Sequence, residues 1–242
     1  SAEFGYYLYT PGGYSSNTMN YPLVVFLHGQ GERGNGTASI DQLKKVLNTG
    51  LPKVIKDNKW HPSHPMLVVS PQFHAAVVTG AWGDKDPENL KGFIKYMIDH
   101  YRVNPKRIYL TGLSHGGNGV YDYITTVDDS ATYIAAAAPI AAYGLNNGFK
   151  KSNDTPFWTF VGGNDGPSGG NFSSSINFVT KYNAQVPAPK YQAKFTGYIG
   201  VGHDCWTMTY DGTGMTNGKV DPDYDPFDES LADWMLQYKR ED

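Results

Sequence analysis

Three polar residues, far apart in the sequence, have the types and the order of a nucleophile and its activating partners. The first is Ser114, in Gly112-Leu113-Ser114-His115-Gly116, directly after the predicted strand Arg107–Thr111. Glycines two positions either side of a serine are typical of a sharp strand-to-helix turn, because both flanks pass close to neighbouring backbone. Such a turn presents the hydroxyl at its apex. We therefore predict that Ser114 is a nucleophile; an ordinary glycine-rich turn is the alternative.

A serine hydroxyl is a weak nucleophile at neutral pH and needs a base that removes its proton. His203 is the last histidine in the chain, and we expect it in a loop after a late strand. Asp165 follows the apolar run Pro156–Val161 and completes the order serine, acid, histidine. It would hold the imidazole tautomer and stabilise the imidazolium. The alternative for Asp165 is a turn former, since Asn-Asp-Gly favours turns.

Attack on a carbonyl creates a negative oxygen that needs hydrogen-bond donors. We predict two backbone amides for this role, those of His115, next to the nucleophile, and Gln30, in the glycine-rich loop Gly29–Gly36. The alternative for the Gln30 loop is a simple strand-ending turn. In the same loop, Glu32 and Arg33 are expected to form a local pair.

Two tryptophans, Trp82 and Trp206, are candidate walls of a substrate pocket, although aromatic core packing explains each equally well. The side chain of His115 either lines this pocket or faces solvent. His28 is expected to be structural. These assignments leave the substrate open.

The remaining histidines and the cysteine predict no further chemistry. His61, His64 and His74 do not have the spacing of metal ligands on one helix, so no metal site is expected. Cys205, the single cysteine, is interpreted as a small buried hydrophobe, and it excludes a disulfide within the chain. The chemistry described above needs neither a metal nor an organic cofactor.

Short apolar runs alternate with amphipathic stretches, which predicts a mostly parallel sheet covered by helices. The clearest helix begins at Asp86-Pro87 and carries an apolar stripe from Leu90 to Tyr101. We expect strands over Phe4–Thr10, Pro22–His28, Met66–Ser70, Arg107–Thr111, Tyr133–Ala138, Pro156–Val161 and Tyr191–Tyr198. We expect further helices over Ser39–Asn48, Gly116–Thr126, Phe172–Asn183 and Asp228–Lys239, the first with Ile40, Leu43, Val46 and Leu47 on one stripe.

The chain has 242 residues without a visible repeat or linker, so a single domain over residues 1–242 is expected. A hydrophobic share of 40% supports a packed core, and a net charge of −3 without a basic cluster argues against a nucleic-acid partner. No apolar run reaches the roughly 18 residues that span a bilayer. The first residues do not form a signal peptide. Abundant tyrosine and glycine with few charges favour a secreted or periplasmic protein.

Four segments, in this order, resemble one branch of the α/β-hydrolase superfamily, the phospholipase/carboxylesterase-like and feruloyl-esterase-like predicted esterases. They are Leu27–Gly34, Ser70–Gln72, Arg107–Gly117 and Gly200–Trp206. Some members of the branch are peptidases of the prolyl-oligopeptidase type. The resemblance implies an α/β-hydrolase fold, a three-layer αβα sandwich, and the same assignments as above: Ser114, Asp165, His203 and the amides of Gln30 and His115.

The chain departs from that branch at three places. His115 occupies a position that is often Met, Val161–Asp165 replaces a common His-Gly-x-x-Asp segment, and the loop Ser70–His74 is individual to this chain. The expected reaction is hydrolysis of carboxylic esters through an acyl-enzyme, on small molecules or on acyl or feruloyl groups of a polysaccharide, in an open cleft. The alternatives are a prolyl-oligopeptidase-like peptidase and a non-catalytic carbohydrate-binding module on a hydrolase scaffold. The oligomeric state is not predicted.

Overall fold

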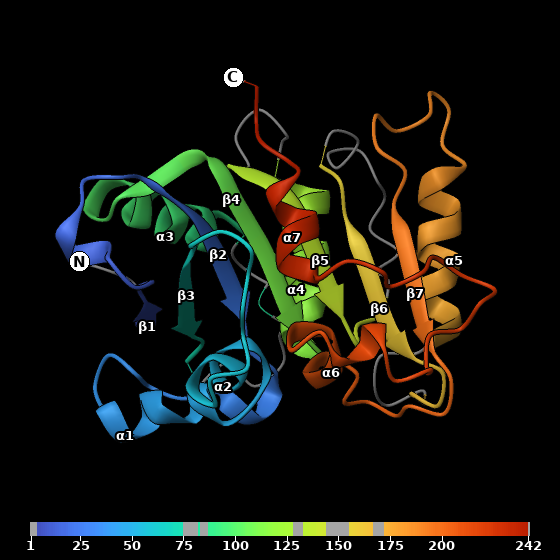
Figure 1. Ribbon diagram of the computed structural model, residues 1–242, viewed down its shortest axis with the longest axis horizontal. Coiled ribbons are helices and arrows are strands. Elements are labelled where there is room, and N and C mark those ends of the chain that lie inside the picture. The colour runs from blue at the N-terminus through green and yellow to red at the C-terminus, as the bar shows by residue number, and fades with distance from the viewer. Residues whose placement is uncertain are drawn as a thin grey trace.

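The computed structural model describes residues 4–74, 82, 87–127, 133–143, 155–166 and 172–241. These residues form a seven-stranded sheet in the order β1-β3-β2-β4-β5-β6-β7 (Figure 1). β1 pairs antiparallel with β3 at one edge, and the other neighbouring strands are parallel. The strands are β1 (Gly5–Tyr9), β2 (Tyr21–Leu27), β3 (Leu67–Gln72), β4 (Val103–Leu113), β5 (Ile134–Ile140), β6 (Trp158–Gly162) and β7 (Lys194–Tyr198).

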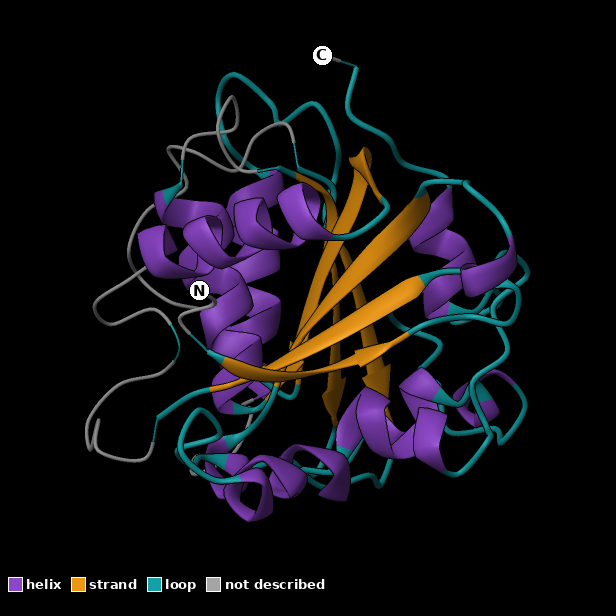
Figure 2. Cartoon of the chain, turned by 90° about the vertical axis from the view of Figure 1, so that its left-hand side faces the viewer, coloured by secondary structure: helices purple, strands orange, loops and turns teal. Residues whose placement is uncertain are grey.

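Helices cover both faces of this sheet, as the view along its edge shows (Figure 2). The longer helices lie on one face and the shorter ones on the other. On the first face are α3 (Pro87–His100), α4 (His115–Thr126) and α5 (Phe172–Asn183); on the second are α2 (Gly50–Lys56), α6 (Trp206–Tyr210) and α7 (Leu231–Leu236). The expected three-layer αβα sandwich is confirmed.

The central strand β2 shows how the sequence builds this arrangement. Its side chains alternate between the two faces, so that Leu23 and Val25 pack against the first helical layer while Val24 and Phe26 pack against the second. All of β2 is buried, which explains why its sequence is a continuous apolar run rather than an alternating one. None of the described helices is long and apolar enough to cross a membrane.

The expected strands and α5 are confirmed, whereas several helices differ from their predictions. The segment expected as one helix over Ser39–Asn48 is a short α1 (Ile40–Leu43) followed by a 3₁₀ turn, and Ile40 is 59% exposed. The C-terminal helix begins only after Ser230, whose hydroxyl caps it by accepting from the Asp233 amide. The predicted helix start at Asp86 lies outside the described residues.

Two short helices, α2 and α6, were not predicted. α2 starts at Gly50, which has a φ of +63°, and carries Pro52 in its first turn, where no intrahelical amide bond is lost. A glycine and a proline so close together normally indicate a loop. α6 has five residues, too few for a visible helical repeat.

Candidate active site

The carboxyl ends of the parallel strands meet at the lower edge of the sheet in Figure 1. Ser114 follows β4 directly, Asp165 lies in the turn after β6, and His203 lies in the loop after β7. Residues that are far apart in the sequence are thus delivered to one edge. In open α/β sheets this edge is where ligands bind.

The turn at Ser114 leaves no room for side chains on its flanking glycines. A Cβ atom at Gly112 would lie 2.6 Å from the carbonyl oxygen of Gly116, and one at Gly116 would overlap the carbonyl oxygen of Leu27. Strand β4 and helix α4 therefore cross at backbone contact, which only glycine permits at these positions. The physical reason for the Gly-x-Ser-x-Gly pattern is confirmed here.

Ser114 itself has a strained backbone, with φ 55° and ψ −120°. A non-glycine residue in such a conformation costs on the order of 1–3 kcal/mol and persists only where its surroundings enforce it. The enforcement comes from two hydrogen bonds: the Ser114 amide donates to Ile140 O at 2.9 Å, and Ser114 O accepts from the Asn118 amide at 3.0 Å. Strain of this kind typically marks a functional residue.

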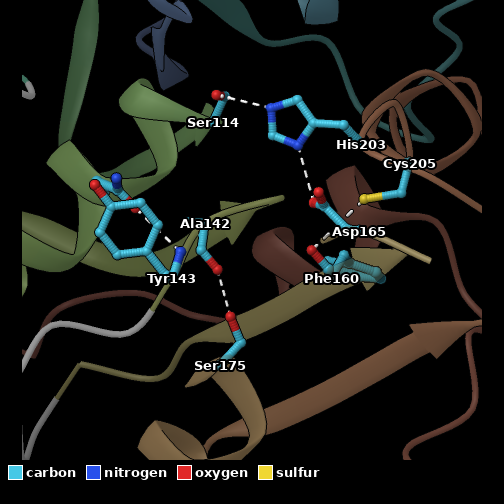
Figure 3. Close-up of polar contacts among 9 residues, drawn as sticks. Ser114, Ala142, Tyr143, Phe160, Asp165, Ser175, His203 and Cys205 are labelled. Carbon is cyan, nitrogen blue, oxygen red and sulfur yellow. Dashed lines mark hydrogen bonds and ion pairs between the residues drawn. The ribbon is translucent and has the colours of Figure 1, made fainter. Parts of the chain in front are cut away.

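Side chains of the three residues form a continuous hydrogen-bonded chain (Figure 3). Ser114 Oγ lies 2.9 Å from His203 Nε2, and His203 Nδ1 lies 2.9 Å from Asp165 Oδ2. An ionised carboxylate only accepts, so Nδ1 carries the proton and Nε2 is left to accept from the serine hydroxyl. The structure thus brings together all three residues of the predicted triad, in the orientation that proton removal requires.

The turn carrying Asp165 is fastened to the loop carrying His203. The amide of Gly163 donates to Tyr198 O and that of Asn164 donates to Val201 O, both at 2.8 Å. The turn closes on itself, because the Asp165 amide donates to Gly162 O at 3.0 Å. The distance between carboxylate and imidazole is therefore determined by backbone contacts between the two segments.

The predicted Gln30 amide belongs to a loop that passes beside the nucleophile. A Cβ atom at Gly29 would lie 3.7 Å from the Cβ of Ser114, and Gln30 begins a 3₁₀ turn immediately afterwards. His115 is the first residue of α4, so its amide is among those that have no partner within a helix. Both predicted amides thus lie next to Ser114 in the chain or in space, and their role as an oxyanion hole stays a prediction.

His28 holds this loop in place and is structural, as expected. Its buried ring accepts at Nε2 from the Phe73 amide (3.0 Å) and donates from Nδ1 to Gly29 O (2.6 Å). Burial lowers the pKa of His28 to about 4, so the ring is neutral at pH 7. The ends of β2 and β3 are thereby joined under the loop.

Gln72 is a second support of the loop, and sequence reasoning missed it. Its buried Nε2 donates to Glu32 O at 2.8 Å and to Gln42 O at 2.6 Å. The only signal in the sequence was its place in the Ser70–Gln72 segment of the resemblance. Gln72 Oε1 is buried without a hydrogen-bond partner among the described residues. The orientation that lets Nε2 donate twice therefore leaves a buried acceptor unsatisfied, which costs free energy.

Arg33 has a partner that was not expected. One of its terminal nitrogens lies 3.0 Å from His115 Nδ1. The guanidinium also lies over the Phe73 ring, at 6.0 Å from its centroid. Arg33 therefore links the loop after β2 to the residue that follows the nucleophile. The local pair of Arg33 with Glu32 stays a prediction.

The two tryptophans have different surroundings. Trp206 is half-buried; its ring meets the His203 ring edge-on at 5.1 Å, and its Nε1 donates to Thr49 Oγ1. Its proposed contact with substrate stays a prediction. Trp82 is only 6% exposed and donates from Nε1 to His28 O at 2.9 Å. The structure thus places Trp82 in the core beneath the loop, the packing alternative, rather than on a pocket wall.

Cys205 lies close to the triad in sequence but is fully buried, with Sγ against Phe160 O. Burial raises the pKa of its thiol well above the ordinary value, which disfavours the thiolate that a nucleophile needs. Among the described residues, no cluster of three or more His, Cys, Asp or Glu side chains could hold a metal ion.

Comparison with known proteins shows that the chain is similar to esterases. No family model matches the chain. Over 195 residues, 79% of the chain, it is 25% identical to the bifunctional acetylxylan esterase/xylanase XynS20E of Neocallimastix patriciarum. The chain spans only 26% of that protein.

Two solved structures illustrate the similarity in three dimensions. A thermostable esterase superposes with a TM-score of 0.59 and 25% identity over 97% of this chain and 59% of its own. The feruloyl esterase module from Clostridium thermocellum superposes with a TM-score of 0.56 and 16% identity over 86% of this chain and 79% of its own. The chain therefore has the α/β-hydrolase fold and is similar to esterases of that fold.

Proposed function

We propose that the chain is a serine hydrolase that cleaves carboxylic esters through an acyl-enzyme intermediate. The observation that carries this proposal is the hydrogen-bonded chain from Ser114 Oγ through His203 to Asp165, each step 2.9 Å long. It is supported by the strained backbone of Ser114, with φ 55° and ψ −120°, because strained conformations of this kind cluster at active sites.

In the first half of the reaction, Ser114 Oγ attacks the ester carbonyl while His203 Nε2 takes the hydroxyl proton. The carbonyl oxygen becomes an oxyanion, which the amides of Gln30 and His115 stabilise by donating to it. His203, now an imidazolium held by Asp165, gives the proton to the departing alkoxide. The alcohol leaves, and the acyl group stays on Ser114.

The second half repeats these roles with water. His203 removes a proton from the water as its oxygen attacks the acyl carbonyl, and the same two amides hold the second oxyanion. The imidazolium then returns the proton to Ser114 Oγ, and the carboxylic acid is released. Every proton that moves in this scheme passes through His203, and no metal or organic cofactor takes part.

The preferred substrates are acyl or feruloyl esters on a polysaccharide, with small esters as further substrates. The names of the relatives support this class, since they include an acetylxylan esterase and a feruloyl esterase module. A secreted or periplasmic location suits a polysaccharide substrate. We also propose that the chain is a single domain, since its described residues share one sheet.

Covalent labelling with a fluorophosphonate tests the proposal directly, because this reagent reacts with an activated serine. The wild type should label, and Ser114→Ala should not. Ser15→Ala is the matched control, since Ser15 is an exposed serine remote from His203 in the sequence, and it should label like the wild type. A wild type that fails to label, or a Ser114→Ala variant that labels equally, would reject a catalytic serine in favour of a non-catalytic module.

A further inference from the structure

The contact between Arg33 and His115 determines the chemical state of a ring beside the nucleophile. A guanidinium nitrogen of Arg33 lies 3.0 Å from His115 Nδ1. Arginine is protonated at any ordinary pH and has five N–H donors but no acceptor. The contact is a hydrogen bond only if His115 Nδ1 accepts, so His115 must be the neutral tautomer with its proton on Nε2.

The surroundings of His115 agree with this tautomer. Burial, the charge of Arg33 and the neighbouring His203 together lower the pKa of His115, which disfavours an imidazolium there. The backbone of the preceding residue is held by hydrogen bonds from Ser114 N to Ile140 O and from Asn118 N to Ser114 O. His115 is thus a neutral ring on a fixed backbone, one residue from the nucleophile, and it remains partly exposed.

Arg33 is also held in position. Its guanidinium lies over the Phe73 ring at 6.0 Å, and its carbonyl accepts from Lys45 Nζ at 3.5 Å. Its loop is the one that His28 and Gln72 fasten to β3. The Arg33–His115 contact therefore joins two segments that are each held by hydrogen bonds. Because arginine can only donate, this contact determines the orientation of the His115 ring.

We propose that His115 Nε2–H donates a hydrogen bond to an oxygen on the alcohol half of the bound ester, and that Arg33 is the residue that positions it. The preferred substrates are then esters whose alcohol carries further hydroxyl or ether oxygens, as an acylated sugar does. This inference rests on the proposed esterase function and specifies its substrate class.

The alcohol half is favoured because His203 must approach the leaving oxygen to protonate it. His115 is bonded to Ser114, whose Oγ lies 2.9 Å from His203 Nε2. The proposal therefore places the donor beside the position where the alcohol departs. A neutral donor suits uncharged sugar oxygens, whereas an imidazolium would favour an anion.

The tautomer can be measured without any substrate. Two-bond ¹H–¹⁵N correlation spectra of ¹⁵N-histidine-labelled protein at pH 7 distinguish a protonated from a bare ring nitrogen, and His115→Asn assigns the signal. We expect a protonated Nε2 and a bare Nδ1 in the wild type, and a mixture of tautomers in Arg33→Met. A proton on Nδ1, or an imidazolium, in the wild type would overturn the proposal.

Substrate preference tests whether His115 donates a hydrogen bond to the alcohol half of the ester. The measured quantity is the ratio of kcat/KM for an acetylated methyl xyloside to kcat/KM for phenyl acetate, whose alcohol has no further oxygen. One uncharged hydrogen bond corresponds to a change of about two- to tenfold. We expect His115→Leu to lower the ratio about fivefold, mainly through the KM of the xyloside. His115→Asn, which keeps an N–H donor, should recover most of it, and Arg33→Met should lower it about twofold.

Lys44→Met is the matched control for the charge lost in Arg33→Met. Lys44 is an exposed cation that, like Arg33, follows β2 in the sequence. Its ratio should equal that of the wild type. If His115→Leu leaves the ratio unchanged, or lowers both activities equally, the proposed contact is wrong. Failure of the esterase proposal would look different, because the wild type would then hydrolyse neither ester and would not label with fluorophosphonate.

Discussion

Asp165 Oδ2 lies 2.9 Å from His203 Nδ1, and the two side chains differ sharply in exposure: the carboxylate side chain is 2% exposed and the imidazole side chain 37%. Of these two side chains, the aspartate is therefore buried and only the histidine is accessible from outside. This asymmetry suits a carboxylate that orients the base and never touches substrate.

Replacing Asp165 with asparagine tests that orienting role. An amide has nearly the same shape, but its NH₂ group can donate to Nδ1 and so favours the wrong imidazole tautomer. We expect kcat for a small aryl ester to fall by about 10³–10⁴-fold with little change in KM, as loss of the orienting acid does in serine triads. Asp204→Asn is the control, since Asp204 bonds to Thr207 instead. An Asp165→Asn enzyme with nearly full kcat would exclude Asp165 as the acid.

Gly116→Ala should disrupt the turn that carries the nucleophile. The added methyl would overlap the carbonyl oxygen of Leu27, a backbone atom at the carboxyl end of β2. We expect the free energy of unfolding to fall by several kcal/mol, more than the roughly 1–3 kcal/mol typical of overpacking, since here the backbone must move. Urea denaturation measures this loss.

Gly92→Ala is the opposite case and serves as the control. Gly92 lies within α3, and a Cβ there meets nothing within 4 Å. An alanine should stabilise the helix by about 0.5–1 kcal/mol. If Gly116→Ala were as stable as Gly92→Ala, the close crossing of β4 and α4 would be incorrect.

His28 should make stability depend on pH. Its pKa falls from 6.5 in the unfolded chain to about 4 in the fold, so the unfolded state binds the proton more readily. The stabilisation is complete above pH 6.5 and is lost as the pH falls toward 4, amounting to about 3 kcal/mol over that interval. Urea midpoints between pH 7 and pH 4 measure it.

His28→Gln removes the titrating group while keeping polar atoms, and it provides the comparison. The variant is expected to be less stable than the wild type at pH 7, because two buried hydrogen bonds change. Its stability should nevertheless decrease less steeply with acidification. Equal slopes for the two proteins would mean that His28 does not bind a proton on unfolding.

Gln72→Met tests the support beneath the Gln30 loop. Methionine has a similar length but cannot donate, so the carbonyl oxygens of Glu32 and Gln42 lose their contacts. We expect the free energy of unfolding to fall by about 1–3 kcal/mol. We also expect kcat to fall by a larger factor than KM changes, since the loop carries an oxyanion donor. Gln237→Met, at an exposed glutamine, should change neither quantity. Normal kcat in Gln72→Met would separate the loop from catalysis.

Sequence reasoning reached the elements and residues that depend on local pattern. β2 follows from its continuous apolar run and α5 from its amphipathic pattern, and the glycines around Ser114 follow from backbone crowding. The order of Ser114, Asp165 and His203 was sufficient to select them because parallel strands deliver their carboxyl ends to one edge.

Contacts between side chains of distant segments could not be predicted in this way. Gln72 holds backbone 30 and 40 residues away, and Arg33 reaches across 82 residues to His115. Neither contact leaves a periodic pattern in the sequence, because each depends on how two distant segments approach one another in the fold. The assignment of Trp82 to the core is of the same kind, since its partner is the carbonyl oxygen of His28.

The placement of the three catalytic candidates after β4, β6 and β7 also affects how the protein can be assayed. No two of them lie in the same segment, and both hydrogen bonds join residues from different strand ends. A chain in which β6 or β7 has detached has no activated serine, even if β4 and α4 persist. The fraction of molecules that a fluorophosphonate labels therefore measures how many have β4, β6 and β7 in place together, and it can follow refolding.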